Sequence, residues 1–226
     1  MRTLIHVPII HTSADLGSMA KDIAKKGIAN LGQEIWTTHR ETVERFWDVI
    51  SNYFDSTNVA GMKIYQDGMV GEDEVGKQIV EDAAKAGSKN YQLVSRLLER
   101  GAVLVRTEDF KLVKQEYDRL LAITRAKSTT RKIVAFTKYK LVKTMLLNKR
   151  DAFIAKRIDE TLGPDESGIL FIGAFHKIKN KLPKGISVRE TKDANKVSLY
   201  QKLLPFQDKY PKRFDELGKY LVSEIT

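Results

Sequence analysis

Two of the four histidines in this 226-residue chain follow closely after short apolar runs. Residues 3–10 precede His11, and residues 168–173 lie just before His176. A neutral imidazole can take up a proton near neutral pH or coordinate a divalent metal. The pattern therefore indicates a centre for general-base chemistry or metal binding at the ends of two predicted strands.

Carboxylates follow two further apolar runs. Asp67 comes directly after residues 62–66, and Glu108 comes shortly after residues 102–106. A carboxylate near a histidine can orient the ring, share a metal ion or act as a general base. The set His11, His176 and Asp67 supplies enough ligands for Mn, Fe, Co or Zn with an open position for water. The alternative for each residue is a helix cap or a polar side chain that meets solvent.

The apolar runs predict an α/β fold with a central, mostly parallel sheet of four or five strands. Short apolar segments alternate with helical patterns from one end of the chain to the other, which is typical of βαβ units. In such sheets the carboxyl ends of the strands share one edge, where ligands bind. We expect one α/β domain over residues 1–226. The predicted strands are residues 3–10, 62–66, 102–106, 168–173 and 186–190.

A long helix, or two helices in sequence, is predicted before the fourth strand. Residues 129–162 contain neither Gly nor Pro, and Gly163-Pro164 ends the stretch. Arg150 lies 12 residues before Leu162, or about 18 Å along a helix. We expect this position to bring Arg150 towards the edge of the sheet that carries the histidines.

The other two histidines are expected to be structural. His6 alternates with apolar neighbours inside the first predicted strand, as a hydrogen-bonded core or edge residue would. His39 lies on the apolar stripe of the helix predicted over residues 32–54.

Four stretches resemble the TraB-like group, which includes the Tiki metalloproteases, the ChaN-type haem-binding proteins and the erythromycin-esterase-like enzymes. GILFIGAFH, residues 168–176, is similar to the group's apolar strand that ends in GxxH. NKRDAFIAKRIDETL, residues 148–162, resembles the Arg-Asn or Arg-Asp helix before that strand. KIYQDG, residues 63–68, and the strand ending in His11 take the places of two further family strands. The chain departs from the group in lacking Gly before His11 and in having Asp67 where Glu is more common.

The resemblance implies that His11, Asp67, Arg150 and His176 face one pocket. It implies a hydrolase-like protein in which a histidine, or a metal held by histidine and carboxylate, activates water on an ester or amide of a small molecule or peptide. Arg150 and backbone N–H groups near Gly173 would stabilise the oxyanion. Because members of the group hydrolyse with metal, hydrolyse without it, or bind haem, the resemblance does not choose among these.

Composition leaves two alternatives open. The net charge is +10, and basic residues gather in residues 125–157 and 177–196, so an anionic partner such as nucleic acid is one. A non-catalytic module that binds a small ligand or haem through His11 or His176 is the other. The absence of Cys excludes disulfides and thiolate metal sites. We expect no membrane span and no signal peptide, and hence a cytoplasmic location.

Overall fold

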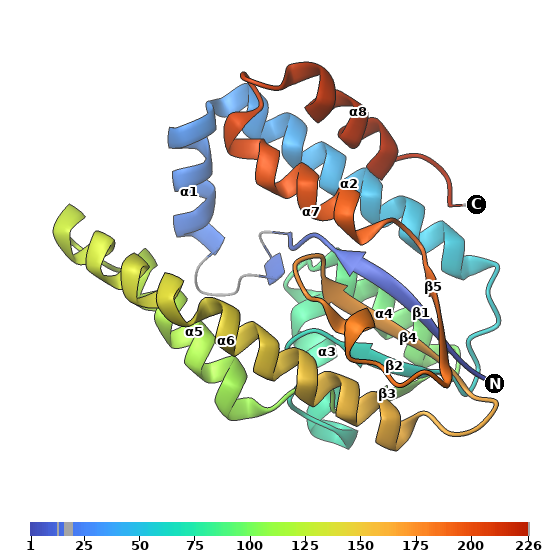
Figure 1. Ribbon diagram of the computed structural model, residues 1–226. Coiled ribbons are helices and arrows are strands. Elements are labelled where there is room, and N and C mark those ends of the chain that lie inside the picture. The colour runs from blue at the N-terminus through green and yellow to red at the C-terminus, as the bar shows by residue number, and fades with distance from the viewer. Residues whose placement is uncertain (13, 16–19, 226) are drawn as a thin grey trace.

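The computed structural model describes residues 1–12, 14–15 and 20–225, and its five strands all run parallel in one sheet (Figure 1). Their order across the sheet is β3-β2-β4-β1-β5. The predicted α/β class and parallel sheet are confirmed. The strands are β1 (Arg2–Ile9), β2 (Lys63–Gln66), β3 (Val103–Val105), β4 (Ser167–Gly173) and β5 (Ile186–Glu190).

Eight α-helices flank the sheet in the described part of the chain. The stretch predicted as one long helix or two is a single helix, α6. None of the described helices has the length and apolar content needed to cross a membrane. The helices are α1 (Ala20–Leu31), α2 (Gln33–Asp55), α3 (Asp73–Lys85), α4 (Lys89–Glu99), α5 (Phe110–Thr124), α6 (Thr129–Thr161), α7 (Ala194–Leu203) and α8 (Pro211–Leu221), with short 3-10 turns η2 (Ile178–Asn180) and η3 (Leu204–Phe206).

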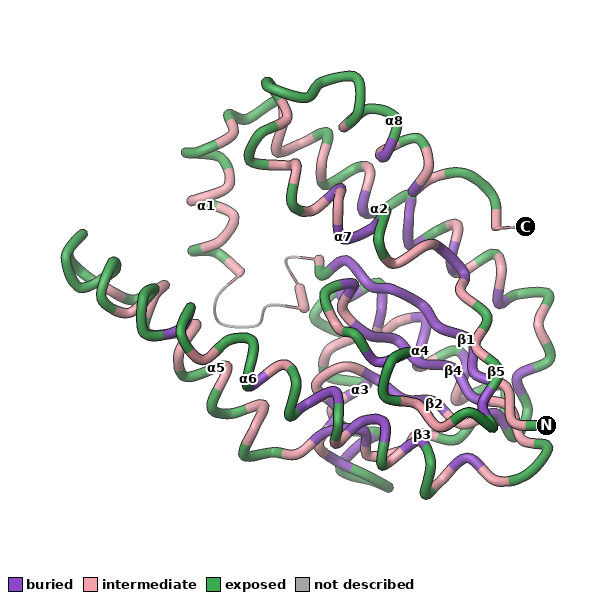
Figure 2. The backbone as a smooth tube through the Cα atoms, in the orientation of Figure 1, coloured by how far each residue is buried: buried purple, intermediate pink, exposed green. Residues whose placement is uncertain are grey.

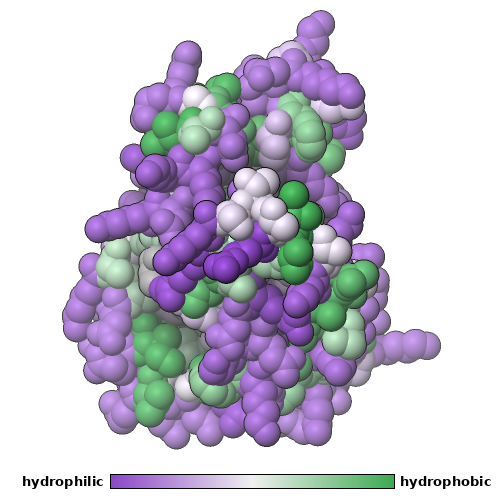
Figure 3. Space-filling view, turned by 90° about the vertical axis from the view of Figure 1, so that its left-hand side faces the viewer, coloured by the Kyte–Doolittle hydropathy of each residue, from purple (hydrophilic) through white to green (hydrophobic). Residues whose placement is uncertain are grey.

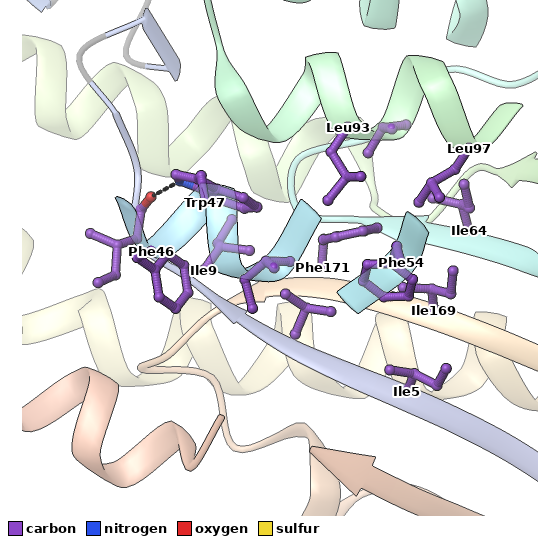
Figure 4. Packing of buried hydrophobic residues seen from close by; sticks show 14 of the residues in the cluster. Ile5, Ile9, Phe46, Trp47, Phe54, Ile64, Leu93, Leu97, Ile169 and Phe171 are labelled. Carbon is purple, nitrogen blue, oxygen red and sulfur yellow. Dashed lines mark hydrogen bonds between the residues drawn. The ribbon is translucent and has the colours of Figure 1, made fainter. Parts of the chain in front are cut away.

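One face of the sheet packs against α2, α4, α7 and α8. Alternate side chains of a strand point to opposite faces, and Ile5 and Ile9 of β1 point to this one, where they join Phe171 of β4 (Figure 4). Trp47 of α2 closes the cluster at the carboxyl end of β1, because its indole N–H donates to the Ile10 carbonyl at 3.1 Å. This contact fixes the chain just before His11.

The opposite face packs against the C-terminal half of α6. Leu4 and Leu170 point to this side and meet Ile154 and Ile158, all of them buried. Since Arg150 precedes Ile154 by one helical turn, packing of this half of α6 brings Arg150 over the carboxyl edge of the sheet.

The outer parts of α5 and α6 extend away from the sheet as a two-helix hairpin (Figures 1 and 2). We call residues 119–149 the arm. The first ten residues of α6 include none that is buried, and Tyr139 is the first buried residue along this helix. Buried residues of α6 therefore begin only at the inner part of the arm, while Lys26 Nζ of α1 donates to the Thr124 carbonyl near its outer end at 3.2 Å.

Pro8 lies where a residue without an N–H is tolerated. The β1–β5 ladder stops at the pair His6–Glu190, so Pro8 lies beyond the last residue of β1 that pairs with β5. The missing N–H of Pro8 therefore costs no hydrogen bond to β5.

Candidate active site at the carboxyl edge of the sheet

Asp67 lies at the centre of a cluster of ionisable side chains. It follows β2, and its Oδ2 accepts a hydrogen bond from the Gly173 N–H at the end of β4 at 3.0 Å. The Nε2 atoms of His176 and His11 lie 3.8 Å and 3.9 Å from the same oxygen. Arg150 Nη2 donates to Asp67 Oδ1 at 2.6 Å. The structure thus brings together all four residues expected at this edge: His11, Asp67, Arg150 and His176.

The carboxyl group of Asp67 is held as an anion. Burial alone would raise its pKa, but the charges of His176, Arg150 and His11, with the Gly173 N–H, hold the pKa of Asp67 well below its usual value. Its side chain is 9% exposed. A charge so enclosed can stabilise a positive charge that develops on a neighbouring imidazole.

Arg150 is the link between two further carboxylates and Asp67. Its Nε donates to Glu108 Oε2 at 3.0 Å, and its Nη1 donates to Glu116 Oε2 at 2.6 Å. Nη2 also donates to Glu108 Oε1. Tyr139 completes the group with a hydrogen bond from its hydroxyl to Glu116 Oε1 at 2.7 Å. Each guanidinium nitrogen therefore already has a carboxylate acceptor, which is what a buried arginine requires.

Glu108 differs from Asp67 in its ionisation. Its side chain is fully buried, and burial raises the pKa of Glu108 despite the opposing effect of Arg150. It is held beside Asp67 by the same guanidinium. Two carboxylates that share one arginine thus have pKa values shifted in opposite directions.

His176 is fixed by a residue that strand-end reasoning did not reveal. Its Nδ1 lies 2.5 Å from Oδ1 of Asp151, and the other carboxyl oxygen of Asp151 accepts from the Lys177 N–H at 2.9 Å. Burial opposes protonation of the ring, but the hydrogen bond to Asp151 and the charge of Asp67 raise the pKa of His176. The side chain of His176 is 5% exposed. The two neighbouring carboxylates thus oppose loss of the ring proton.

His11 is the accessible histidine of the cluster. Its side chain is 45% exposed, and it borders a cavity of about 710 Å³ that residues of α1 and α2 also line. Trp36, His39 and Lys89 also border this cavity. A substrate in the cavity would meet His11 before it met any other residue of the cluster.

The remaining histidines are held as the sequence analysis expects. His39 Nδ1 lies 3.1 Å from the Tyr200 hydroxyl, and burial lowers the pKa of His39 to about 4. His6 is buried in β1, with Nδ1 3.0 Å from Glu190 Oε1.

The residues do not fit the divalent metal considered for His11, His176 and Asp67. No group of three or more His, Cys, Asp or Glu side chains among the described residues is arranged to hold a metal ion. One oxygen of Asp67 is taken by the permanent cation of Arg150, and Nδ1 of His176 faces Asp151. A second cation at this point would meet Arg150 at close range. If the chain binds haem, His11 is the histidine that could serve as its axial ligand, because its ring is accessible.

Two residues of the cluster, Glu116 and Asp151, were missed by strand-end reasoning because they lie inside helices. The sequence carried a signal only for Asp151, which follows Arg150 in the stretch similar to the TraB-like group. Comparison of the chain with protein-family models, with curated proteins and with solved structures finds no match. The resemblance therefore stays a prediction.

Proposed function

We propose that this chain is a hydrolase-like protein of the TraB/erythromycin-esterase-like group, in which His11 activates water for attack on an ester or amide. The observation that carries the proposal is the position of His11. Its ring is accessible from a large cavity, and it lies beside the enclosed anion of Asp67. An imidazole in contact with solvent and supported by a carboxylate is the usual arrangement of a general base.

The reaction would begin with transfer of a proton from water to His11. The hydroxide oxygen would form a bond to the carbonyl carbon, and the bond from that carbon to the leaving oxygen or nitrogen would then break. The proton on His11 would pass to the leaving group. The anion of Asp67 would stabilise the imidazolium that exists between these two transfers.

Arg150 and His176 are assigned positioning roles in this proposal. The resemblance implies that Arg150 contacts the oxyanion, but its nitrogens already donate to Asp67, Glu108 and Glu116. The Gly173 N–H is likewise used by Asp67. We therefore assign Arg150 to holding Asp67 in place beside His11.

The test is hydrolysis of a panel of p-nitrophenyl esters by the full chain and by His11→Gln. General-base catalysis contributes about 10²- to 10⁴-fold, so kcat/KM should fall at least about 100-fold in the variant. Lys25→Gln, an exposed change on α1 outside the cavity lining, should keep the parent rate. Ester hydrolysis no faster than in buffer, or full activity of His11→Gln, would contradict the proposal.

A second candidate function, binding of nucleic acid by the arm, is supported by how charge is distributed. Residues 119–149 contain nine Lys or Arg and no Asp or Glu, against a net charge of +10 for the whole chain. Almost the entire positive excess therefore lies on a projecting two-helix hairpin. Figure 3 looks onto the side where the arm ends and shows mainly hydrophilic side chains with separate apolar patches. Tyr139 is buried and bonded to Glu116, so it is no stacking surface, whereas Phe136 is exposed.

Such binding should be weak and should depend steeply on salt. Counterions compete for each phosphate contact, with a log–log slope of about −0.9 per contact on duplex DNA. Fluorescence anisotropy of a labelled duplex over a range of KCl concentrations would measure it. Replacing Arg131, Lys132 and Lys138 together by Gln should lower both affinity and slope, and the same change at Lys209, Lys212 and Lys219 should not. Binding that ignores salt, or that both triple variants weaken equally, would refute this function.

A further inference from the structure

A second pocket, which His176 also lines, lies between the connection from β4 to β5 and helix α7. Its volume is about 390 Å³, and it is separate from the cavity that His11 borders. Figure 1 shows α7 beside the end of β1, with the β4–β5 connection next to it. We call it the lysine pocket, and its polar lining includes His6, His176, Lys177, Lys179, Ser198 and Lys202.

Both histidines of the lysine pocket are held in place by carboxylates. His6 Nδ1 contacts Glu190, and His176 Nδ1 contacts Asp151. Their side chains are 3% and 5% exposed. In His6, Nε2 is therefore the nitrogen left to meet a ligand, whereas Nε2 of His176 lies 3.8 Å from Asp67 Oδ2. Two nearly buried imidazoles oriented by separate partners form a built site, which scattered surface residues would not.

The lining of the lysine pocket has cations and neutral polar groups but no Asp or Glu. Lys179 is paired with Glu190 at 3.0 Å. Among the described residues, no carboxylate lies within ion-pair distance of Lys177 or Lys202. Lys202 and Lys143 lie over the half-exposed ring of Phe175, each 5.6 Å from its centre. The pocket thus presents positive charge that the protein itself does not neutralise.

We infer that the lysine pocket binds the phosphate group of a small phosphorylated molecule. Phosphate offers a double negative charge and several acceptor oxygens, which suits lysine ammonium groups and imidazole N–H donors. The inference rests on the proposed function only in taking that molecule as the substrate whose ester or amide His11 attacks. His176 would then lie between the two sites, because its ring lines the lysine pocket while its Nε2 faces Asp67.

Titration of the full chain with inorganic phosphate and with phenyl phosphate tests the inference, using NMR of the histidine ring nitrogens. Four histidines make the spectrum simple to assign. Saturable shifts are expected at His6 and His176, and none at His39, which packs on Tyr200 elsewhere. If His6 and His176 had purely structural roles, their ring nitrogens would show no saturable shift with phosphate.

Variants decide whether the binding belongs to this pocket. Lys177→Met and Lys202→Met should each raise the Kd for phenyl phosphate about tenfold, the value of one lost charge-assisted hydrogen bond. Lys181→Met removes an exposed lysine of the same loop that does not line the pocket, and should leave the Kd unchanged. Circular dichroism would show that each variant folds.

The outcomes separate this inference from the proposed hydrolysis. Phosphate binding without esterase activity supports the pocket and counts against the hydrolase. Esterase activity without phosphate binding would contradict the phosphate inference and leave the proposed hydrolysis standing. Phosphate binding that Lys181→Met weakens as much as the other two variants would have the same meaning. Shifts at all four histidines would also overturn the phosphate inference, because they would indicate an effect of salt on the whole chain.

Discussion

At the scale of single residues, Arg150 does the most to hold the cluster together. Its side chain is 10% exposed and it meets Asp67, Glu108 and Glu116. Burial of charge is costly unless each group keeps a partner. The arginine is therefore required to keep the surrounding carboxylates in place, whatever reaction the site performs.

Replacement of Arg150 by Met should strongly destabilise the fold. Removing one partner of a buried ion pair typically costs about 3–5 kcal/mol, because uncompensated charge is left behind. Urea unfolding at neutral pH would measure the loss. The adjacent Lys149→Met is the control, since Lys149 is exposed and should change stability by less than about 0.5 kcal/mol. A loss of similar size in both variants would show that the cluster tolerates unpaired charge.

The contribution of His176 to stability should depend on pH with a definite sign. Its pKa is raised in the folded chain by Asp151 and Asp67 against the effect of burial. A raised pKa means that the stabilisation is complete below the unfolded value, about 6.5, and is lost as pH rises through the folded value. The loss of stability in His176→Gln should therefore be larger at pH 6 than at pH 9.

Urea unfolding of the parent chain and of His176→Gln at both pH values would measure this difference. The ionisation of Asp67 should not change between pH 6 and pH 9, so it does not affect this difference in stability. Its pKa is lowered, despite burial, by His176, Arg150 and His11, so its own contribution is lost only in acid below the unfolded value of about 3.9. A difference that grows towards alkaline pH would show that His176 is neutral in the folded chain.

At the scale of elements, the sequence predicts where the strands lie but does not predict their order in the sheet. Alternation of short apolar runs with helical stripes locates all five strands to within two residues at each end, and residues 186–190 match β5. The order β3-β2-β4-β1-β5 depends on pairs far apart in the chain, such as Leu4 with Gly168, and periodicity says nothing about these. Logic based on strand ends finds His11, Asp67 and His176 because parallel strands share an edge.

The helical members of the cluster were harder to predict for a physical reason. An acid inside a helix is usually solvated, and Glu116 is directed inward only because α5 packs against α6. Asp151 is 1% exposed because His176 and the Lys177 N–H cover it. Helix packing decides both positions, and a single sequence does not encode which acid will be covered.

Helix α6 should divide into two parts that differ in protection. The stretch over residues 129–138 includes no buried residue, whereas Ile154 and Ile158 are fully buried against the sheet. Backbone amides in weakly packed segments open at low free energy. Amides of residues 129–138 should therefore exchange with deuterium at least about tenfold faster than those of residues 150–158, a difference of about 1.4 kcal/mol.

Hydrogen exchange followed by mass spectrometry would measure this contrast within one helix. The buried stretch of α2 around Phe46 and Ile50 serves as a slow reference. Equal protection along α6 would mean that something covers the arm in solution, and it would favour a permanent partner at residues 119–149.

At the scale of the whole molecule, the two apolar clusters share one sheet and should unfold together. Ile5 and Ile9 of β1 face one cluster, while Leu4 of the same strand and Leu170 of β4 face the other. Loss of packing on either face frees the same strands, which then no longer support the opposite face. We therefore expect one cooperative transition for residues 1–226.

The variant Ile158→Ala tests this coupling across the sheet. Ile158 is fully buried in the cluster under α6, while Trp47 is buried in the other cluster. Truncation of a buried Ile to Ala costs about 2–5 kcal/mol. In a Trp36→Phe background, Trp47 is the remaining indole, and its fluorescence should report the full loss although it lies on the far face. The circular dichroism midpoint should move by the same amount, and Val134→Ala, an exposed change on the arm, should move neither. If helix signal is lost while Trp47 fluorescence keeps the parent midpoint, the two faces unfold separately and the chain is not one cooperative domain.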